Sequence, residues 1–238
     1  MLGVFGKWGT GKTSILNMVV NEINYLSDND DDSPIIVNFS PWNYTDKDNL
    51  ISLFFRVLKN KLDLDKDEEK RKKIGKALTD YSDALDALSL VPMIGSGLAA
   101  LLKTIAKAQG AELSKDVDID TTKEHLEKVL DDTNQKIIVI IDDIDRLTNT
   151  QIKDIFQLVK QVGNFPNIIY VLSMDRDVVC RALESVHDID GAEYLEKIVQ
   201  IPFEIPALMK PQIREIFLAK LNDTIKDFFD DITWDENY

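Results

Sequence analysis

The amino-acid sequence predicts an α/β fold in which helices cover a mostly parallel β-sheet, and three observations predict it. Short runs rich in β-branched residues alternate with segments of helical periodicity along most of the chain. One run, residues 137–141, is apolar at every position, as expected of a central parallel strand with both faces covered. A glycine-rich loop, residues 6–13, lies between the first apolar run and the first helical segment. Such alternation is typical of sheets built from strand–helix–strand units.

The individual elements follow from local patterns along the chain. Strands are expected over short apolar or β-branched runs, at residues 2–5, 35–39, 137–141, 168–173 and 199–206. Helices are expected where apolar side chains recur every three or four positions, at residues 14–23, 49–62, 121–132, 152–162, 177–184 and 211–229. Thr121 and Glu124 have the spacing of a capping box, which predicts Thr121 as the N-cap of its helix.

Residues 63–120 carry no strand signal and are predicted to form a helical insertion in a core made of residues 1–62 and 121–238. The insertion begins with a charged helix and contains an uncharged stretch, residues 87–102, that is interrupted by one proline and two glycines. A membrane span needs about 20 apolar residues, so a full crossing is disfavoured. A buried helical hairpin or a surface that binds a protein partner is expected instead.

Composition narrows the classes of function. The formal net charge of −14 disfavours nucleic acid as a partner, and with it a DNA-acting motor. The single cysteine, Cys180, allows no disulfide within the chain, and together with His125 and His187 it makes no convincing zinc cluster. A reducing, cytoplasmic location is therefore expected, with peripheral membrane contact left open.

The glycine-rich loop has the spacing of a phosphate-binding loop, and we call it the phosphate loop. Its sequence Gly-Lys-Trp-Gly-Thr-Gly-Lys-Thr fits G-x-x-x-x-G-K-[ST]. Glycine tolerates positive φ, so the backbone can fold closely around an anion at the positive end of the following helix. Lys12 would reach the β- and γ-phosphates, and the Thr13 hydroxyl would ligate Mg²⁺. The residues expected to bind nucleotide are Gly6, Trp8, Gly9, Thr10, Gly11, Lys12, Thr13 and Ser14.

An ordinary glycine-rich turn is the alternative for this loop, and the strand and helix that flank it disfavour that alternative.

A second polar group, the acidic turn at residues 142–146, follows the strongest predicted strand, at the edge where α/β proteins bind ligands. Asp142 is expected to complete the Mg²⁺ shell, and Asp143 to polarise the attacking water. Strands often end in acidic turns, however, and Asp145 could simply cap the next helix.

Two further catalytic candidates join Lys12 and Asp143. Ser173 ends the next predicted strand, where it would contact the γ-phosphate or hold the water, or else cap the following helix. Arg146 and Arg176 are candidates for neutralising charge in the transition state; an internal ion pair is the alternative for both, and the favoured one for Arg176. The pattern [NT]-K-x-D, with which GTPases recognise guanine, occurs once, at Asn60–Asp63, at the end of the helix expected at residues 49–62 and not after a strand, so ATP is the expected nucleotide.

These motifs, in this order, resemble the KAP family of P-loop ATPases. The specific features are the tryptophan in the phosphate loop, an aromatic block after the second strand, and an acidic block of two aspartates followed by a hydrophobic residue, Asp and Arg. The similar blocks are Gly6–Ser14, Phe39–Tyr44, Ile141–Leu147, Tyr170–Val179 and Tyr194–Phe203. They span residues 3–206 and leave residues 63–120 unmatched.

The resemblance implies a three-layer P-loop NTPase fold of the additional-strand (ASCE) type, with the phosphate-loop strand beside the Ser173 strand and the Asp142 strand next outward. It implies ATP and Mg²⁺ as cofactors, bound by Lys12, Thr13 and Asp142, and a water-activating role for Asp143. Many family members carry membrane segments between the phosphate loop and the acidic block. Bacterial members often resemble switch ATPases of phage-defence systems.

The motifs leave two classes of function open. A slow regulatory ATPase would use ATP to change how the insertion or a flanking effector domain meets a protein partner. A small-molecule phosphotransferase is the alternative, but it needs an acceptor pocket with a placed base or basic residues, for which the sequence shows no candidate. The regulatory ATPase is therefore the preferred hypothesis, with the oligomeric state left open.

Overall fold

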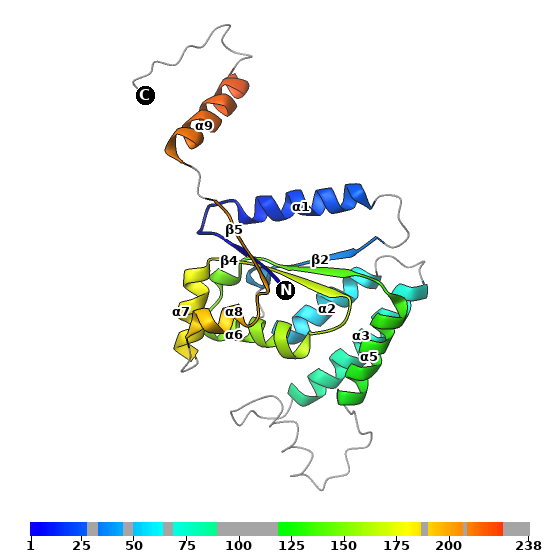
Figure 1. The fold of residues 1–238 in the computed structure, drawn as a ribbon. Helices are drawn as coiled ribbons and strands as arrows, with labels where there is room; N and C mark the ends of the chain where they lie inside the picture. The colour runs from blue at the N-terminus through cyan, green and yellow to red at the C-terminus, as the bar shows by residue number, and fades with distance from the viewer. Residues whose placement is uncertain are drawn as a thin grey trace. The chain divides into compact units, whose positions relative to one another are not determined.

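The structure of the protein is a computed structural model, shown in Figure 1. It describes residues 1–27, 33–44, 50–63, 69–89, 119–186, 190–206 and 209–225. The chain divides into two compact units, Met1–Glu204 and Ile205–Tyr238, which are described separately. The first unit contains the sheet and the helices around it, and therefore the predicted site.

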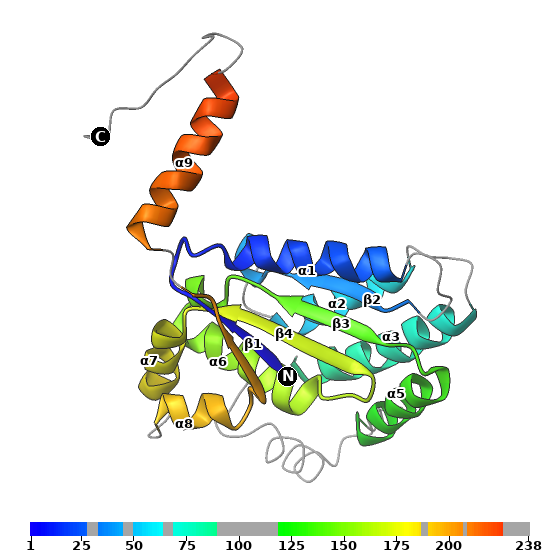
Figure 2. The ribbon, with the colours of Figure 1, turned by 45° about the horizontal axis from the view of Figure 1, so that its top comes forward.

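Five parallel strands form the sheet of the first unit, in the order β2-β3-β4-β1-β5 (Figure 2). Their bounds are β1 Leu2–Phe5, β2 Ile35–Phe39, β3 Ile137–Ile141, β4 Ile168–Met174 and β5 Ile201–Glu204. Strand β4 stands between β3 and β1, which is the additional-strand arrangement that the resemblance implied. The α/β fold with a mostly parallel sheet is confirmed.

Helices on both faces make the sheet the middle of three layers (Figures 1 and 2). Helix α1 (Lys12–Leu26) lies on one face, and the larger helical layer lies on the other. The remaining helices of this unit are α2 Leu50–Asp63, α3 Glu69–Ser89, α5 Ile119–Thr133, α6 Asn149–Gln157, α7 Arg176–Val186 and α8 Gly191–Glu196. Short turns of 3₁₀-helix, η1 (Pro41–Asn43) and η2 (Ile144–Arg146), follow β2 and β3, and a π-helical turn, η3 (Leu158–Val162), extends α6.

A chain of edge-on aromatic contacts runs through the core on the larger helical side. Ring centroids lie between 5.2 and 5.5 Å apart along the series Phe39, Phe54, Phe55, Tyr81 and Phe165. Edge-to-face pairs of this kind contribute about 0.5–1.5 kcal/mol each beyond their burial. Because Phe39 is the last residue of β2, the series holds the end of that strand in place and with it the sheet edge that carries the candidate site.

Part of the predicted insertion, residues 63–120, packs into this core. Helix α3 buries Ile74, Leu78 and Tyr81. The Tyr81 hydroxyl donates to the carbonyl oxygen of Val162 at 3.2 Å, which ties α3 to the end of the α6 segment. The first helix of the predicted insertion therefore helps to close the core.

The rest of the predicted insertion lies mainly outside the described residues. These exclude residues 90–118, which hold most of the uncharged stretch 87–102. The separate insertion, its hairpin and its partner surface therefore stay predictions. Among the described residues, no helix is both long enough and apolar enough to cross a membrane.

Two of the helix starts that differ from those predicted involve residues with a capping-box spacing. Helix α5 begins at Ile119, so Thr121 lies inside its first turn and the prediction of Thr121 as N-cap was wrong. Helix α6 begins at Asn149, not at residue 152, because Thr148 and Gln151 form a capping box. The Thr148 amide donates to Gln151 Oε1 at 3.1 Å, and the Gln151 amide donates to Thr148 Oγ1 at 3.4 Å.

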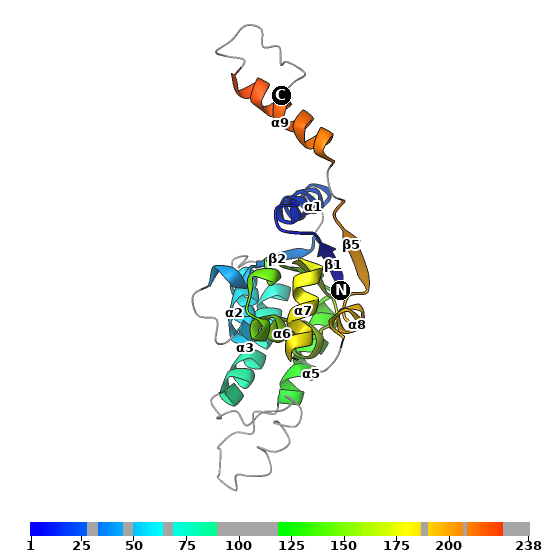
Figure 3. The same cartoon turned by 90° about the vertical axis from the view of Figure 1, so that its left-hand side faces the viewer.

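A short helix before the last strand was not predicted at all. Helix α8 starts where Asp190 Oδ1 accepts hydrogen bonds from the amides of Ala192 and Glu193, at 2.8 and 3.1 Å. It packs against α7 (Figure 3). Six residues are too few to show helical periodicity, so only the N-cap could have indicated it. Strand β5 is correspondingly shorter than the predicted strand at 199–206.

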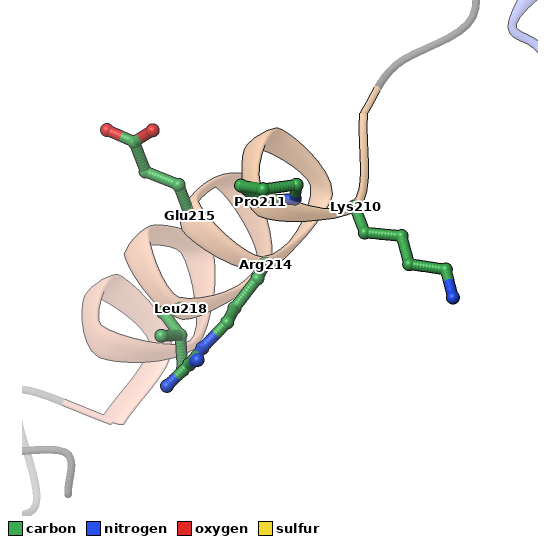
Figure 4. A pocket seen from close by; sticks show the side chains of 5 residues that line it. All are labelled: Lys210, Pro211, Arg214, Glu215 and Leu218. Atoms are coloured by element: carbon green, nitrogen blue, oxygen red, sulfur yellow. The ribbon is translucent and has the colours of Figure 1, made fainter. Parts of the chain in front are cut away.

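The second unit contains helix α9, Lys210–Ile225, which buries none of its side chains. It corresponds to the predicted helix at 211–229, of which residues 226–229 lie outside the described part. A shallow hollow on it is lined by Lys210, Pro211, Arg214, Glu215 and Leu218 (Figure 4). Because one exposed helix supplies all five side chains, the hollow does not enclose a ligand as binding pockets do. It carries none of the predicted site residues.

Candidate nucleotide-binding site

The parallel sheet brings the predicted site residues to one edge. Strand β1 pairs with β4 so that Val4 lies beside Ser173, and the phosphate loop follows β1 directly. On the other side of β4 lies β3, which ends at Ile141 and is followed by Asp142 and Asp143. The phosphate loop, the acidic turn and Ser173 therefore meet at the carboxyl ends of the strands, where ligands of open α/β sheets bind.

Two glycines give the phosphate loop its shape. Gly9 has φ of 82° and Gly11 has φ of 89°, which are conformations that side chains other than glycine rarely adopt. A Cβ added at either position would meet nothing within 4 Å, so the requirement is conformational and does not come from crowding. The Thr10 amide and hydroxyl both donate to the Lys7 carbonyl oxygen, at 3.2 and 2.8 Å, and close the turn between them.

The ends of the phosphate loop are fixed while its tip faces solvent. The Gly6 amide donates to the Met174 carbonyl oxygen at 3.2 Å, which ties the loop to β4. Trp8, near the tip, is 80% exposed. Thr13 and Ser14 are exposed in the first turn of α1, so their side chains and the amide ends of that turn are open to a ligand.

Lys12 is buried and folded back along the phosphate loop. Its ammonium group donates to the carbonyl oxygens of Gly6 at 2.9 Å and Lys7 at 3.4 Å. Its Nζ also lies 3.8 Å from Asp145 Oδ2, and both side chains are only 9% exposed. The loop lysine is therefore held between the loop backbone and the acidic turn.

Thr13 and Asp142 join the two halves of the site directly. The Thr13 hydroxyl donates to Asp142 Oδ2 at 2.7 Å, across 129 residues of sequence. The other carboxylate oxygen of Asp142 accepts from the Asp143 amide at 2.8 Å. These two bonds orient the Asp142 carboxylate towards the start of α1.

The donor atoms at this point suit Mg²⁺. The ion prefers oxygen ligands and is commonly held by one or two protein groups together with waters and phosphate oxygens. A hydroxyl and a carboxylate oxygen 2.7 Å apart fit that need. Within the described ranges, no three acidic, histidine or cysteine side chains group closely enough to hold a metal by themselves. The chain would thus supply part of a magnesium shell and leave the rest to water and nucleotide.

Asp143 is paired with Arg146 inside the acidic turn. Arg146 Nε lies 2.9 Å from Asp143 Oδ1, with the arginine 41% and the aspartate 20% exposed. Burial raises the pKa of the Asp143 carboxyl, the neighbouring Asp142 carboxylate raises it further, and the Arg146 guanidinium partly offsets both. A carboxylate of raised pKa is a stronger base, which suits a group that polarises water. Asp143 also has φ of 60°, a left-handed conformation uncommon for residues other than glycine.

Ser173 and Ser40 present buried hydroxyls without partners among the described residues. Ser173 is fully buried, and its Oγ makes no hydrogen bond. The alternative role of Ser173 as a helix cap falls to Asp175, whose Oδ1 accepts from the amides of Asp177 and Val178 at 3.0 and 3.4 Å. No protein group of the described structure therefore competes with a ligand or water for Ser173 Oγ.

Ser40 was missed by the sequence-based prediction. It follows β2 directly, at the same edge of the sheet, and its Oγ is buried without a partner within the described part of the chain. The turn η1 that follows Ser40 lies against η2 of the acidic turn. The signal that could have found Ser40 was its position immediately after a strand, the rule that identified Asp142 and Ser173.

The two candidate arginines both form ion pairs. Arg146 pairs with Asp143 through its Nε, as described. Arg176 lies 3.2 Å from Glu196 and 3.9 Å from Glu204, which agrees with the internal ion pair that was favoured for it. Neither arginine is a free cation beside the phosphate loop.

Comparison with known proteins identifies a longer relative of this chain. The Escherichia coli (strain K12) protein "Phage T7 exclusion protein" is 27% identical over 225 residues, which are 87% of this chain and 30% of that protein. The chain thus spans less than a third of the length of this relative.

Two solved structures, an Aeropyrum pernix Orc1 protein in complex with DNA and Cdc6p from Pyrobaculum aerophilum, share 13% and 15% identity with it. Each alignment covers 93% of this chain and 43% of the other, with TM-scores of 0.43 and 0.45.

The model of the KAP family P-loop domain matches residues 1–228. With this match over nearly its whole length, and with a phosphate loop facing an acidic turn, the chain belongs to the KAP family of P-loop NTPases.

Proposed function

We propose that the chain binds ATP with Mg²⁺, hydrolyses it slowly, and acts as a regulatory switch. The observation that supports this most is the 2.7 Å hydrogen bond between the Thr13 hydroxyl and Asp142 Oδ2. A second contact between the same two segments places Lys12 Nζ 3.8 Å from Asp145 Oδ2. These contacts bring the expected phosphate-binding and metal-binding groups together, although they are far apart in sequence.

In this proposal the residues divide the work between binding and reaction. The phosphate-loop amides and Lys12 bind the β- and γ-phosphates, while Thr13 and Asp142 hold the metal. Bound Mg²⁺ would neutralise charge on the phosphate oxygens. Asp143 would accept a hydrogen bond from the attacking water, and the unpartnered hydroxyl of Ser173 would orient that water or the γ-phosphate.

The regulatory ATPase is preferred over a small-molecule phosphotransferase. A phosphotransferase would need basic or acid–base residues around an acceptor pocket beside the phosphate loop. The groups found around the loop in the described structure are Thr13, Asp142, Asp143, Asp145 and Arg146, and the arginine is already paired. This set suits the nucleotide and water, and its arginine is engaged by Asp143.

A role in phage defence is the biological setting that we propose. It is supported by the likeness to a protein whose name refers to exclusion of phage T7. ATP binding would change the contact between this domain and a protein partner or flanking effector domain. The net charge of −14 disfavours nucleic acid as that partner, while peripheral membrane contact and oligomer formation stay part of the proposal.

The test is product analysis with purified protein, ATP and Mg²⁺ and no added acceptor. The expected result is ADP and inorganic phosphate in equal amounts, with Lys12→Ala inactive in the same preparation. A slow rate is expected, so the inactive variant is the control for contaminating ATPases. ADP formed without free phosphate, or only after an acceptor is added, would favour the phosphotransferase. Equal rates for the two proteins would remove the basis of the proposal.

A further inference from the structure

We propose that Asp145 restrains Lys12 and competes with nucleotide phosphates for its ammonium group, which lowers the affinity of the site for nucleotide. The inference rests on the proposed function, because it concerns the same phosphate loop. It gives Asp145 a role that the family match does not assign: a positioning residue that acts through Lys12 and sets how readily the loop accepts a nucleotide.

The contacts of Lys12 show what a phosphate would have to displace. Its Nζ lies 2.9 Å from the Gly6 carbonyl oxygen, 3.4 Å from that of Lys7 and 3.8 Å from Asp145 Oδ2. The Lys12 and Asp145 side chains are each 9% exposed, so water and salt screen this pair less than a surface pair. A phosphate that draws Nζ towards itself weakens its attraction to Asp145.

Asp145 is poorly placed to follow the lysine or to find another partner. Ile144, which precedes Asp145, and Leu147, which lies two residues after it, are buried at 0% and 7% exposure and anchor η2 in the core. Asp145 Oδ1 is itself buried and has no hydrogen-bond partner within the described ranges. If Lys12 moves to a phosphate, a buried carboxylate loses its cation, and leaving such a charge unpaired is costly.

The other two carboxylates of the acidic turn are satisfied in a different way. Asp142 accepts hydrogen bonds from the Thr13 hydroxyl and the Asp143 amide. Asp143 pairs with Arg146 at 2.9 Å. The ion pair with Lys12 is therefore made by Asp145, although Lys12 also lowers the pKa of Asp143 from a greater distance. Asp143→Asn serves as a control that removes the same charge from the same turn and leaves this ion pair in place.

The experiment measures the affinity for ADP by calorimetry in EDTA, so that the metal ligands do not contribute. Competition predicts that Asp145→Asn binds ADP about three- to tenfold more tightly than the wild type. Asp143→Asn should change the affinity by less than about twofold, and Asp145→Glu, which keeps the charge, should show no gain. Thermal unfolding by circular dichroism checks that each variant is folded.

The sign of the change separates competition from a merely structural role. If Asp145 only supported the turn, Asp145→Asn would bind ADP more weakly, and that result overturns the inference. So does an equal gain in Asp145→Asn and Asp143→Asn, because it would reflect only a lower negative charge near the phosphates.

The pair is tested again by combining Asp145→Asn with Lys12→Met. Competition predicts that the gain disappears when the lysine is absent, whereas a gain that persists shows that Asp145 acts without Lys12. If the wild type binds neither ADP nor ATP, the proposed function and the competition are both wrong. If it binds ADP and Asp145→Asn binds no tighter, the competition alone is wrong.

Discussion

The phosphate loop and the acidic turn lie at the same edge of the sheet, but different forces give them their shape. The loop takes its form from backbone conformation, with positive φ at Gly9 and Gly11. The acidic turn depends on charge, because Asp143 forms an ion pair with Arg146 and Asp145 forms one with Lys12. The loop should therefore be sensitive to changes in backbone freedom, and the turn to the loss of single charges.

Among changes in the acidic turn, removing the charge of Asp143 is expected to have the largest effect on the reaction. Asp143→Asn should lower the ATPase turnover about a hundredfold, because it removes the group that accepts the water proton, while ATP affinity stays within about threefold of wild type. Steady-state kinetics measures the turnover, and calorimetry on the same preparation measures the ATP affinity. Wild-type turnover in Asp143→Asn would transfer the role to Asp145, the next carboxylate of the acidic turn.

Asp142 should act on metal-dependent binding. Asp142→Asn keeps the shape of the side chain but loses the charge that would face Mg²⁺ beside Thr13. The gain in ATP affinity on adding Mg²⁺ should fall by roughly tenfold or more, with affinity in EDTA little changed. Titration of ATP with and without Mg²⁺ measures this difference. A gain as large as that of the wild type would show that Asp142 is not a metal ligand.

The conformational requirement of the phosphate loop is tested at Gly11. Gly11→Ala should lower the free energy of unfolding by about 1–2 kcal/mol and weaken ATP binding, because φ of 89° is strained for alanine. Gly11→Asn should cost less, although asparagine is larger, because it adopts left-handed conformations more readily. Urea unfolding of both variants shows which substitution lowers the free energy of unfolding more. If asparagine costs more than alanine, the difficulty is one of space and not of φ.

Of these substitutions, the change at Arg146 should have the smallest effect, and that effect is on stability. Its ion pair with Asp143 is 41% exposed on the arginine side, and exposed pairs contribute about 0.2–1 kcal/mol. Arg146→Gln should therefore lower the free energy of unfolding by less than about 1 kcal/mol, as measured by urea titration. A larger loss would mean that the pair is a main support of the acidic turn.

The sequence was sufficient for the phosphate loop and the sheet because both depend on local patterns. Glycine spacing predicted the positive φ values of Gly9 and Gly11, although Gly6, grouped with them, does not adopt positive φ. The β-branched run at 137–141 predicted β3, which lies inside the sheet between β2 and β4. These features need no knowledge of which distant groups meet.

The acidic turn could be located from the sequence but not resolved residue by residue. The sequence suggested that Asp145 could cap the next helix, and only the fold shows that it lies 3.8 Å from the Lys12 ammonium group. Arg146 was a candidate for either transition-state charge or an internal ion pair, and its partner Asp143 is visible only once the turn is built. Ser40 and helix α8 escaped notice because a lone serine and a six-residue helix carry little periodic signal.

The central claim is that the phosphate loop binds ATP through Lys12. The most direct test is calorimetric titration of MgATP into the wild type and Lys12→Ala, with circular dichroism to confirm that both are folded. Losing the charged contact to phosphate should weaken binding by about 1.5–3 kcal/mol, or roughly ten- to a hundredfold. Equal affinity of the two proteins for MgATP would contradict the claim.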